Sequence, residues 1–469
     1  MIPLVEIPEI VSHYEPFFRS VFSSEALEQF KRYISGLIVS ENKTVEGINR
    51  IFVIDVRNQS SLNRLLTESP FSVEELNRCR LKLLSSLTGT KMKPKGVLSL
   101  DDTLLMHYGK HFEKIAYLYD STQGCYVLAH NPVNLHYSDD STDYPIDFKL
   151  WEPAQIDKLE VGLKEAGITI RQSKYGLKED DPKKWRNYLL NLWRRHQHKP
   201  EVGKLYESKL LLGQQMLKQF FEDHKGLSLP VTFDNWYTQP AFCRFLHKTL
   251  KASYVGTLAA DDRVVLARGE ERLDEFDQEL QRRHHQALQS GKGPIFRKIT
   301  ISYKGQKETY YSYCKTHVIH NFGKQRLVIN HQKADLQDAP MFFISNKLKW
   351  QAVGITRIRR HRWPVEVYHE EGKADGLSKY QVRDFGAIYR HIALVAVTYS
   401  LLRAAQHDKA LLHKLQRNVE TKLGGSAGYW RRNTQAQALW CLATFIATAL
   451  AQGQTLSELM KPLVAALSR

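Results

Sequence analysis

The spacing of apolar residues changes several times along the chain, and these changes restrict the folds that it can adopt. From residue 24 to about 89, apolar residues recur at helical spacing, as in SSEALEQFKRYISGLIV and SVEELNRCRLKLLSSL. At the start of the second segment, Ser72 and Glu75 have the spacing of a capping box. The basic KMKPKG segment then ends the helical pattern. We predict a helical N-terminal domain over residues 1–92.

A strand pattern follows in the next part of the chain. Three runs, VLSLDDTLLMHY, FEKIAYLYD and CYVLAHNPVNLHY, are rich in residues that favour strands and predict an antiparallel meander. Helical stretches come next, near 152–167, 182–196 and 204–223, and the short runs LPVTFD and SYVGTL predict further strands. Strands that interleave with helices in this way indicate an α/β fold. We assign residues 93–261 to the first part of this α/β core.

The pattern changes twice more before the C-terminus. A charged helical stretch, EERLDEFDQELQRRHHQALQ, precedes short alternating segments separated by turns, which together predict a β-rich insertion over residues 262–350. From about residue 352 the pattern is helical, with a break at LGGSAG. We expect residues 351–405 to complete the core and residues 406–469 to form a helical C-terminal region.

Composition indicates a polyanionic partner and a reducing compartment. The 67 Lys and Arg residues exceed the 50 Asp and Glu residues, giving a formal net charge of +17. Such an excess favours contact with nucleic acid or another acidic partner. The five cysteines are far apart and form no C-x-x-C pair, which argues against zinc or a redox disulfide. With no evident secretory signal, we predict a cytoplasmic protein.

One apolar run needs a separate interpretation. The segment from Ala438 to Ala451 is shorter than the roughly 20 residues that span a bilayer. We expect it to be a core helix, and we expect no membrane association.

Acidic residues at the ends of predicted strands are the first candidates for chemistry. Asp101 and Asp102 follow the apolar VLSL run, and strand alternation lets only one of them face a given site. A turn at the strand end would also explain the pair. Asp234 follows LPVTF, at a strand end where α/β sheets usually place ligand groups, although capping of the next helix is an alternative role.

The segment RIRRHRWPVEVYHEEGK supplies a third carboxylate. Pro364 favours the first turn of a helix, which places Glu366 near a helix N-terminus. His369 and Lys373 follow Glu366 by three and seven positions, so the three side chains share one helix face. A solvated, charged helix end would have the same composition. A catalytic role therefore requires the other carboxylates to lie nearby.

Three converging carboxylates are suited to hard divalent cations. They can hold two Mg²⁺ ions roughly 3.5–4 Å apart, an arrangement that catalyses phosphoryl transfer, and such ions prefer oxygen ligands to Cys. Arg362 and Lys373 stay cationic and suit contacts to phosphate. A nucleic-acid substrate would also account for the positive net charge.

These segments resemble the DDE transposases of cut-and-paste bacterial insertion sequences, in the group with a Tyr-Arg-Glu-Lys signature. The chain reads Arg359-x2-Arg362-x3-Glu366-x6-Lys373, which keeps three of the four signature positions and has Arg359 in place of Tyr. The LDDT and VTFDNWYTQPAF segments are similar to the blocks that carry the first two catalytic acids of such enzymes. The likeness covers roughly residues 20–400.

The resemblance implies a ribonuclease-H-like catalytic core, interrupted by the β-rich insertion, and helical N-terminal and C-terminal regions. It implies Asp102, Asp234 and Glu366 as catalytic ligands of two Mg²⁺ ions, for which Mn²⁺ would substitute, with Asp101 as the alternative first ligand. The expected partners are double-stranded DNA, both terminal inverted repeats and target, and a second copy of the chain in a synaptic homodimer. The expected DNA contacts are Arg359, Arg362, Trp363, His369 and Lys373.

The expected activity is cleavage at transposon ends followed by strand transfer, in a bacterial, nucleoid-associated protein. Relatives use aromatic residues of the insertion to hold a flipped base, but the alternating Tyr310, Tyr311 and Tyr313 are more typical of ordinary strand packing. Two other functions stay open, namely a domesticated relative that binds DNA without cutting it and a structure-specific nuclease. The presence of all three acids argues against the first of these.

Overall fold

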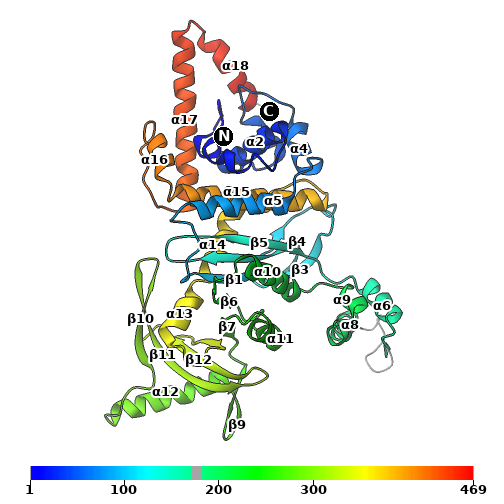
Figure 1. The fold of residues 1–469 in the computed structure, drawn as a ribbon, viewed down its shortest axis with the longest axis vertical. Helices are drawn as coiled ribbons and strands as arrows, with labels where there is room; N and C mark the ends of the chain where they lie inside the picture. Colours follow the sequence, from blue (N-terminus) through cyan, green and yellow to red (C-terminus); the bar gives the residue numbers. More distant parts are fainter. Residues whose placement is uncertain (1, 172–180, 468–469) are drawn as a thin grey trace.

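The computed structural model describes residues 2–171 and 181–467. Its N-terminal part is helical, as predicted, and contains α1 (Glu9–Tyr14), η1 (Glu15–Phe17), α2 (Ser24–Val39), α3 (Val45–Arg50), α4 (Gln59–Thr67) and α5 (Val73–Ser86). The Ser72 hydroxyl accepts a hydrogen bond from the Glu75 N–H at 3.2 Å, which confirms the predicted cap of α5. Helices α2, α4 and α5 pack against α15 (Phe385–Ala405; Figure 1), and Arg80 of α5 also donates hydrogen bonds to the backbone carbonyls of Pro145 and Ile146 in the sheet.

The three predicted strand runs all form strands and open a large sheet, but the first run pairs with the third rather than with the second. The first strands are β1 (Val97–Asp102), β2 (Leu105–Met106), β3 (Ala116–Asp120), β4 (Cys125–Ser138), β5 (Asp143–Trp151), β6 (Val231–Phe233) and β7 (Tyr254–Leu258). Strand β4 lies between β5 and β1 and is antiparallel to both. Strands β6 and β7 then continue the sheet parallel to β1. The order is therefore β5, β4, β1, β6 and β7.

Strand β5 was not predicted from the sequence. Its segment DYPIDFKLW contains Pro145 and several charged residues, which weaken the strand pattern. Among the described strands it pairs only with β4, and such an edge position tolerates proline because one side of the strand needs no ladder hydrogen bonds.

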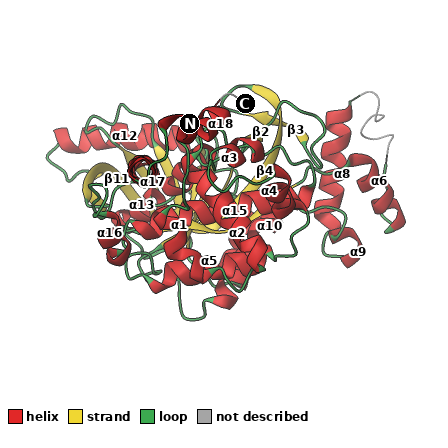
Figure 2. Cartoon of the chain, turned by 90° about the horizontal axis from the view of Figure 1, so that it is seen from above, coloured by secondary structure: helices red, strands yellow, loops and turns green. Residues whose placement is uncertain are grey.

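The helices between β5 and β6 fall into two groups. Helices α6 (Ile156–Glu165), α8 (Pro182–His196) and α9 (Pro200–Gly203) have a small apolar cluster of their own and stand to one side of the molecule (Figure 2). Helix α10 (Lys209–Asp223) instead packs against β4 and β5. It therefore covers one face of the sheet, with its first turn near the end of β1.

The β-rich region predicted over residues 262–350 joins the same sheet. After α11 (Pro240–Arg244) and η2 (Phe245–Thr249) come β8 (Arg263–Leu266), β9 (Gly269–Arg272), α12 (Leu273–Gln289), β10 (Arg297–Tyr303), β11 (Gln306–Ile319), β12 (Gly323–His331) and β13 (Met341–Ser345). Strand β13 is antiparallel to β7 and to β12, so hydrogen bonding is continuous from β1 to β11. The sequence pattern gave no sign of this pairing, because the partners are far apart in the chain.

The C-terminal part is helical, as predicted. It contains α13 (Ala352–Arg360), α14 (Trp363–Ala374), α15, α16 (Lys409–Leu415), α17 (Ala427–Ala451) and α18 (Leu456–Leu467). Helices α15 and α17 are long and apolar enough to cross a membrane by length and composition. The most apolar window of α15 is 78% buried inside the protein, so this helix is part of the core.

The expectation that Ala438 to Ala451 forms a core helix is wrong. Only 22% of the apolar window of α17 is buried, and Leu439, Trp440 and Leu450 are exposed. The N-terminal half of α17 packs on α2 and α15, whereas its second half projects beyond them towards α18 (Figure 1). An apolar run thus predicts a helix here but not its burial.

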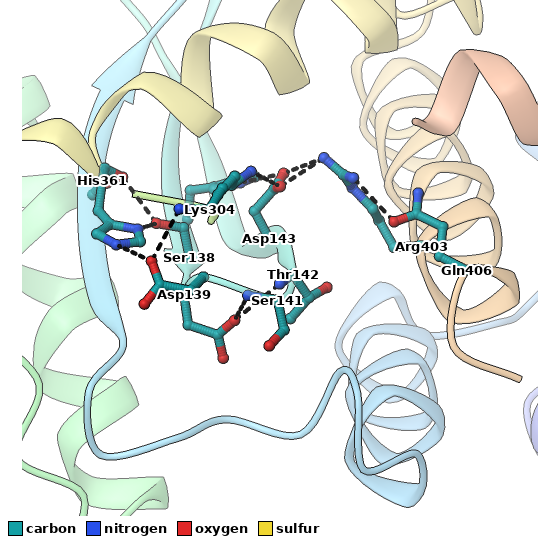
Figure 3. A network of polar contacts seen from close by, with 12 residues as sticks. Ser138, Asp139, Ser141, Thr142, Asp143, Lys304, His361, Arg403 and Gln406 are labelled. Atoms are coloured by element: carbon teal, nitrogen blue, oxygen red, sulfur yellow. Dashed lines mark hydrogen bonds and ion pairs between the residues drawn. The ribbon is translucent and has the colours of Figure 1, made fainter. Parts of the chain in front are cut away.

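A buried ion-pair network joins the sheet, the β10–β11 turn and α15 (Figure 3). Asp143 of β5 is fully buried and accepts hydrogen bonds from Arg403 of α15 (2.6 Å) and Lys304 of the turn (2.9 Å). Burial by itself raises the pKa of Asp143, but Arg403 and Lys304 hold this pKa well below its usual range. The carboxylate therefore stays charged and connects three segments that are distant in sequence.

We predict that Asp143→Asn lowers the free energy of unfolding at neutral pH by about 3–5 kcal/mol, because two cations lose their buried partner. Asp140→Asn, in the segment between β4 and β5 and half exposed, should cost no more than about 1 kcal/mol. Because the folded-state pKa of Asp143 is depressed, its contribution is present at neutral pH and is lost as pH falls below about 4. Urea denaturation of the wild type and both variants over a pH series checks this. The prediction fails if the difference in free energy of unfolding between the wild type and Asp143→Asn does not decrease in acid.

Candidate active site

The ends of β1 and β6 place two carboxylates next to each other. Leu100 of β1 lies opposite Phe233 of β6 in the parallel pairing, so the next residues, Asp101 and Asp234, occupy neighbouring positions. Residues that are paired across adjacent strands point to the same face of the sheet. Asp101 is 8% exposed, and Asp234 is partly buried. Two acidic side chains thus share one edge of the sheet.

Helix α14 brings a third carboxylate to this edge. Pro364 lies in its first turn, as predicted, and Glu366 follows in the same turn. The Arg362 guanidinium, at the N-cap position of α14, donates one hydrogen bond to the Asp101 carboxylate at 2.5 Å and another to the Glu366 carboxylate. Arg362 also acts electrostatically on Asp234. Arg362 therefore bridges Asp101 and Glu366 directly, and Asp234 lies within range of its charge.

Two hydrogen bonds from the sheet hold the junction between α13 and α14 in place. The backbone carbonyl of His361 accepts hydrogen bonds from the hydroxyls of Ser99 (3.1 Å) and Ser138 (2.9 Å), which lie on β1 and β4. Figure 3 shows Ser138 directed at His361. Because His361 directly precedes Arg362, these two buried hydroxyls set the position from which the guanidinium reaches the carboxylates.

Electrostatics indicate that this edge carries too much negative charge for its surroundings. Burial raises the pKa of Asp101 to about 7, against the opposing effect of Arg362, and the carboxylates of Asp234 and Asp102 raise it further. Burial also raises the pKa of Asp234. Ionised carboxylates in this environment need an additional cation close by.

Asp102 lies in a different environment from Asp101. Its carboxylate accepts hydrogen bonds from the Lys209 ammonium (2.8 Å), the Tyr237 hydroxyl (2.7 Å) and the Asn131 side-chain amide (2.9 Å). Burial tends to raise the pKa of Asp102, but Lys209 and these hydrogen bonds bring it below its usual value. Because side chains alternate along β1, Asp102 faces α10, whereas Asp101 faces α14.

The residues predicted to contact DNA are placed differently from one another. Trp363 is 49% exposed, and Lys373 is partly exposed on α14. The Arg359 guanidinium donates to the Thr257 hydroxyl at 2.7 Å, and burial, reinforced by Arg362, lowers its pKa to about 10. It remains cationic beside the carboxylates.

His369 does not have the position that was expected of it. It is 7% exposed and lies 3.0 Å from the Asn134 side-chain amide, inside the contact between α14 and the sheet. Burial lowers the pKa of His369 to about 3, so the imidazole is neutral. The burial of His369 against the sheet does not suit a DNA contact, whereas Glu366 and Lys373 on the same helix are partly exposed.

Two residues near the carboxylates were missed by the sequence analysis. The Lys209 ammonium lies 4.8 Å from the ring centre of Trp151 and 5.1 Å from that of Trp236, besides its contact with Asp102. Trp236 is 46% exposed, two residues after Asp234. The VTFDNWYTQPAF block contained Trp236, whereas no local pattern marked Lys209.

The tyrosines Tyr310 and Tyr313 are buried, as expected for strand packing.

The carboxylate set has the chemistry of a divalent-metal site, although its present geometry is not that of one. Among the described residues, no three or more His, Cys, Asp or Glu side chains are grouped closely enough to hold a metal ion. Arg362 lies between Asp101 and Glu366, and its buried Nε has no hydrogen-bond partner. Hard carboxylate oxygens beside an incompletely bonded guanidinium are the donor type that Mg²⁺ or Mn²⁺ prefers.

The comparison with known families includes the residues at this edge of the sheet. Residues 16–289 match the family described as DDE superfamily endonuclease. The matched region covers more than half of the chain and includes Asp101, Asp102 and Asp234, but it ends before Glu366. No curated protein matches the chain significantly. The chain belongs to the DDE superfamily endonucleases, a family of transposase-like nucleases that act on DNA and generally use divalent metal ions.

Proposed function

We propose that this chain is a cut-and-paste DNA transposase, which cleaves DNA at the ends of a mobile element and joins those ends to target DNA. The observation that carries the proposal is the convergence of Asp101, Asp234 and Glu366 around Arg362. These side chains come from two neighbouring strand ends and from a helix more than a hundred residues later in the chain. A non-catalytic DNA-binding protein would not need such an arrangement.

The strand order supports a ribonuclease-H-like core for this proposal. An antiparallel meander followed by two parallel strands gives the order β5, β4, β1, β6 and β7, with the carboxylates at the ends of β1 and β6. In our proposal the core comprises residues 93–261 and 351–405. Residues 262–350 form the insertion, residues 1–92 contact the element end, and residues 406–469 form a C-terminal region.

We assign the role of first metal ligand to Asp101. The sequence resemblance favours Asp102, with Asp101 as the alternative. Asp101 shares its sheet face with Asp234 and contacts Arg362, whereas Asp102 is already neutralised by Lys209 on the other face. An acid that is fully hydrogen-bonded to protein groups has little capacity left for a metal ion. The proposed role of Asp102 is to anchor Lys209 and Tyr237, and thereby the turn that carries Asp234.

Asp101, Asp234 and Glu366 would hold two Mg²⁺ ions, for which Mn²⁺ would substitute. Ions bound there supply activation of the attacking oxygen and stabilisation of the leaving oxygen in phosphoryl transfer. The protein contributes orientation and charge. Arg362, which donates hydrogen bonds to two of these carboxylates, would donate to a phosphodiester once metal ions neutralise the acids. The exposed Trp363 and Trp236 would border the DNA on either side.

The partners in this proposal are double-stranded DNA with terminal inverted repeats, target DNA and a second copy of the chain. The surplus of basic residues suits the DNA. The Tyr-Arg-Glu-Lys group is our finer assignment, with Arg359 in the place of Tyr, where it donates to Thr257 of β7. The second candidate, a domesticated DNA-binding relative, would retain DNA affinity but would show no metal-dependent cleavage.

We expect Asp101→Asn, Asp234→Asn and Glu366→Gln each to reduce cleavage of DNA that carries the matching inverted repeats by at least about a thousandfold, because each removes a ligand of the catalytic metals. Binding of the same DNA should be retained. Cleavage is measured on labelled DNA with Mg²⁺ or Mn²⁺. Wild-type cleavage rates in these variants would refute the assignment, and a wild-type protein that binds without cutting would favour the domesticated relative.

Asp101 and Asp102 should respond differently when stability is measured without metal. Asp102→Asn should lower the free energy of unfolding by about 3–5 kcal/mol, because Lys209 loses its carboxylate. Asp101→Asn should change it little, since Arg362 keeps Glu366 as a partner. The double change Asp102→Asn with Lys209→Met should recover part of the loss. Denaturation in EDTA tests this, and equal losses in the two single variants would contradict the division of roles.

Metal binding can be measured without any reaction. Titration with Mg²⁺ or Mn²⁺ should raise the free energy of unfolding of the wild-type protein by about 2.7 kcal/mol at a concentration one hundred times the dissociation constant. Glu366→Gln should largely remove this increase. Lys373→Gln, a charge change on the same helix that spares the carboxylates, serves as control. Stabilisation of the same size in Glu366→Gln would place the metal elsewhere.

A further inference from the structure

A cavity of about 830 Å³ opens between α12 and the strands β10, β11 and β12, and it is separate from the carboxylates. In Figure 1 these elements lie at the end of the molecule opposite α17 and α18. The volume is within the range of sites that hold a small ligand or a nucleotide. Neither the carboxylates nor their hydrogen-bond partners Arg362 and Lys209 line it. The cavity therefore needs an explanation of its own.

The walls of this cavity are strongly basic. Five cationic side chains line it, and Glu279 is the one acidic residue among the lining residues. The cationic side chains are Arg268, Arg283, Arg297, Lys315 and Arg326. Arg268 is paired with Glu279 and with Glu271, so it is the cation best compensated by acid. Most of the positive charge in the cavity is therefore uncompensated.

The remaining cations have few partners in the described part of the chain. Arg297 has no ion pair or side-chain hydrogen bond there, and Arg283 lies 3.9 Å from Glu279, at the outer limit of an ion pair. The Arg326 Nε donates to the Trp350 carbonyl at 2.9 Å, which holds this guanidinium against the wall. Uncompensated cations in a concave surface concentrate positive potential and attract anions.

A neighbouring imidazole responds to this potential. Burial lowers the pKa of His317 in the cavity wall, and Lys315 and Arg326 lower it further. The side chain therefore stays neutral and makes a 2.8 Å hydrogen bond with the Tyr313 hydroxyl. The lowered pKa of His317 thus agrees with the excess of cationic side chains in the cavity wall.

Helix α13 connects the cavity to the carboxylates. Its first residues, Ala352 and Val353, line the cavity, and Arg359 near its other end lies beside the carboxylates. Nine helical residues span about 13 Å at about 1.5 Å per residue. This length corresponds to about four nucleotides at about 3.4 Å per step. The separation between the carboxylates and the cavity is therefore short enough for one DNA strand to contact both.

We propose that this cavity is a second DNA-binding site, in which Arg283, Arg297, Lys315 and Arg326 bind the phosphate backbone of the same DNA that lies at the carboxylates. The inference rests on the proposed function for the identity of the polyanion. It assigns a role to the basic RRHH segment at 282–285, of which Arg283 lines the cavity. Contacts of this kind position DNA without reading its sequence.

The test is equilibrium binding of the full chain to a fluorescein-labelled duplex of arbitrary sequence, measured by anisotropy in EDTA over a series of salt concentrations. The double variant Arg283→Ala with Arg297→Ala should reduce the slope of log affinity against log salt by about 1.8, or about 0.9 for each lost phosphate contact. The matched control is Lys158→Ala with Lys164→Ala, which removes two exposed charges from α6. Its slope should equal that of the wild type.

An unchanged slope in the double variant, or an equal decrease in the α6 control, would overturn the proposal. ATP is added as a competitor that carries phosphates without a polymer backbone. If ATP competes with DNA on the wild type but not on the cavity variant, and both proteins have the same DNA slope, the cavity binds a mononucleotide rather than the DNA backbone, which also overturns the proposal. Because binding is measured without metal, a reduced slope combined with no cleavage by the wild type would refute the proposed function alone. Normal cleavage with an unchanged slope would refute this inference alone.

Discussion

The contact between the Arg362 guanidinium and the carboxylates of Asp101 and Glu366 is the interaction on which the site depends. Without a cation, three buried or half-buried acids at neighbouring positions would repel one another and would lack the solvation that they have in water. Arg362 supplies one positive charge, which is fewer than the acids present. Burial is the main cause of the raised pKa values of Asp101 and Asp234, and neighbouring acids raise them further. A divalent cation bound there would favour the ionised carboxylates.

Strand alternation divides the two consecutive acids of β1 between different tasks. Asp101 faces α14 and the other carboxylates, and Asp102 faces α10, where Lys209 neutralises it. The Tyr237 hydroxyl links Asp102 to the turn after β6, so the acid on the far face helps to hold Asp234 in place. In the proposed function, this pair of adjacent acids serves one site from both faces of the sheet, with Asp101 as a metal ligand and Asp102 as a positioning residue.

Much of the fold could be predicted from local pattern. Helices α2 to α5, the first strands, α12 and the first turn of α14 at Pro364 follow from apolar spacing, capping residues and proline. The predictions failed where burial or pairing depended on distant segments. Edge strand β5 was missed, the pairing of β13 with β7 was not foreseen, and the second half of α17 is exposed rather than buried. Local pattern gives the type of an element, but its neighbours decide what it buries.

The sequence by itself determined which residues could do the chemistry. It supplied acids at two strand ends, Glu366 in the first turn of a helix, and the basic residues Arg359, Arg362 and Lys373 around it. Only the tertiary structure decided that Asp101, rather than Asp102, lies beside Asp234 and Glu366, that His369 is buried, and that Lys209 belongs to the same region. The reason is that the side to which a strand residue points becomes meaningful only when helices cover both faces, and α10 and α14 come from distant parts of the chain.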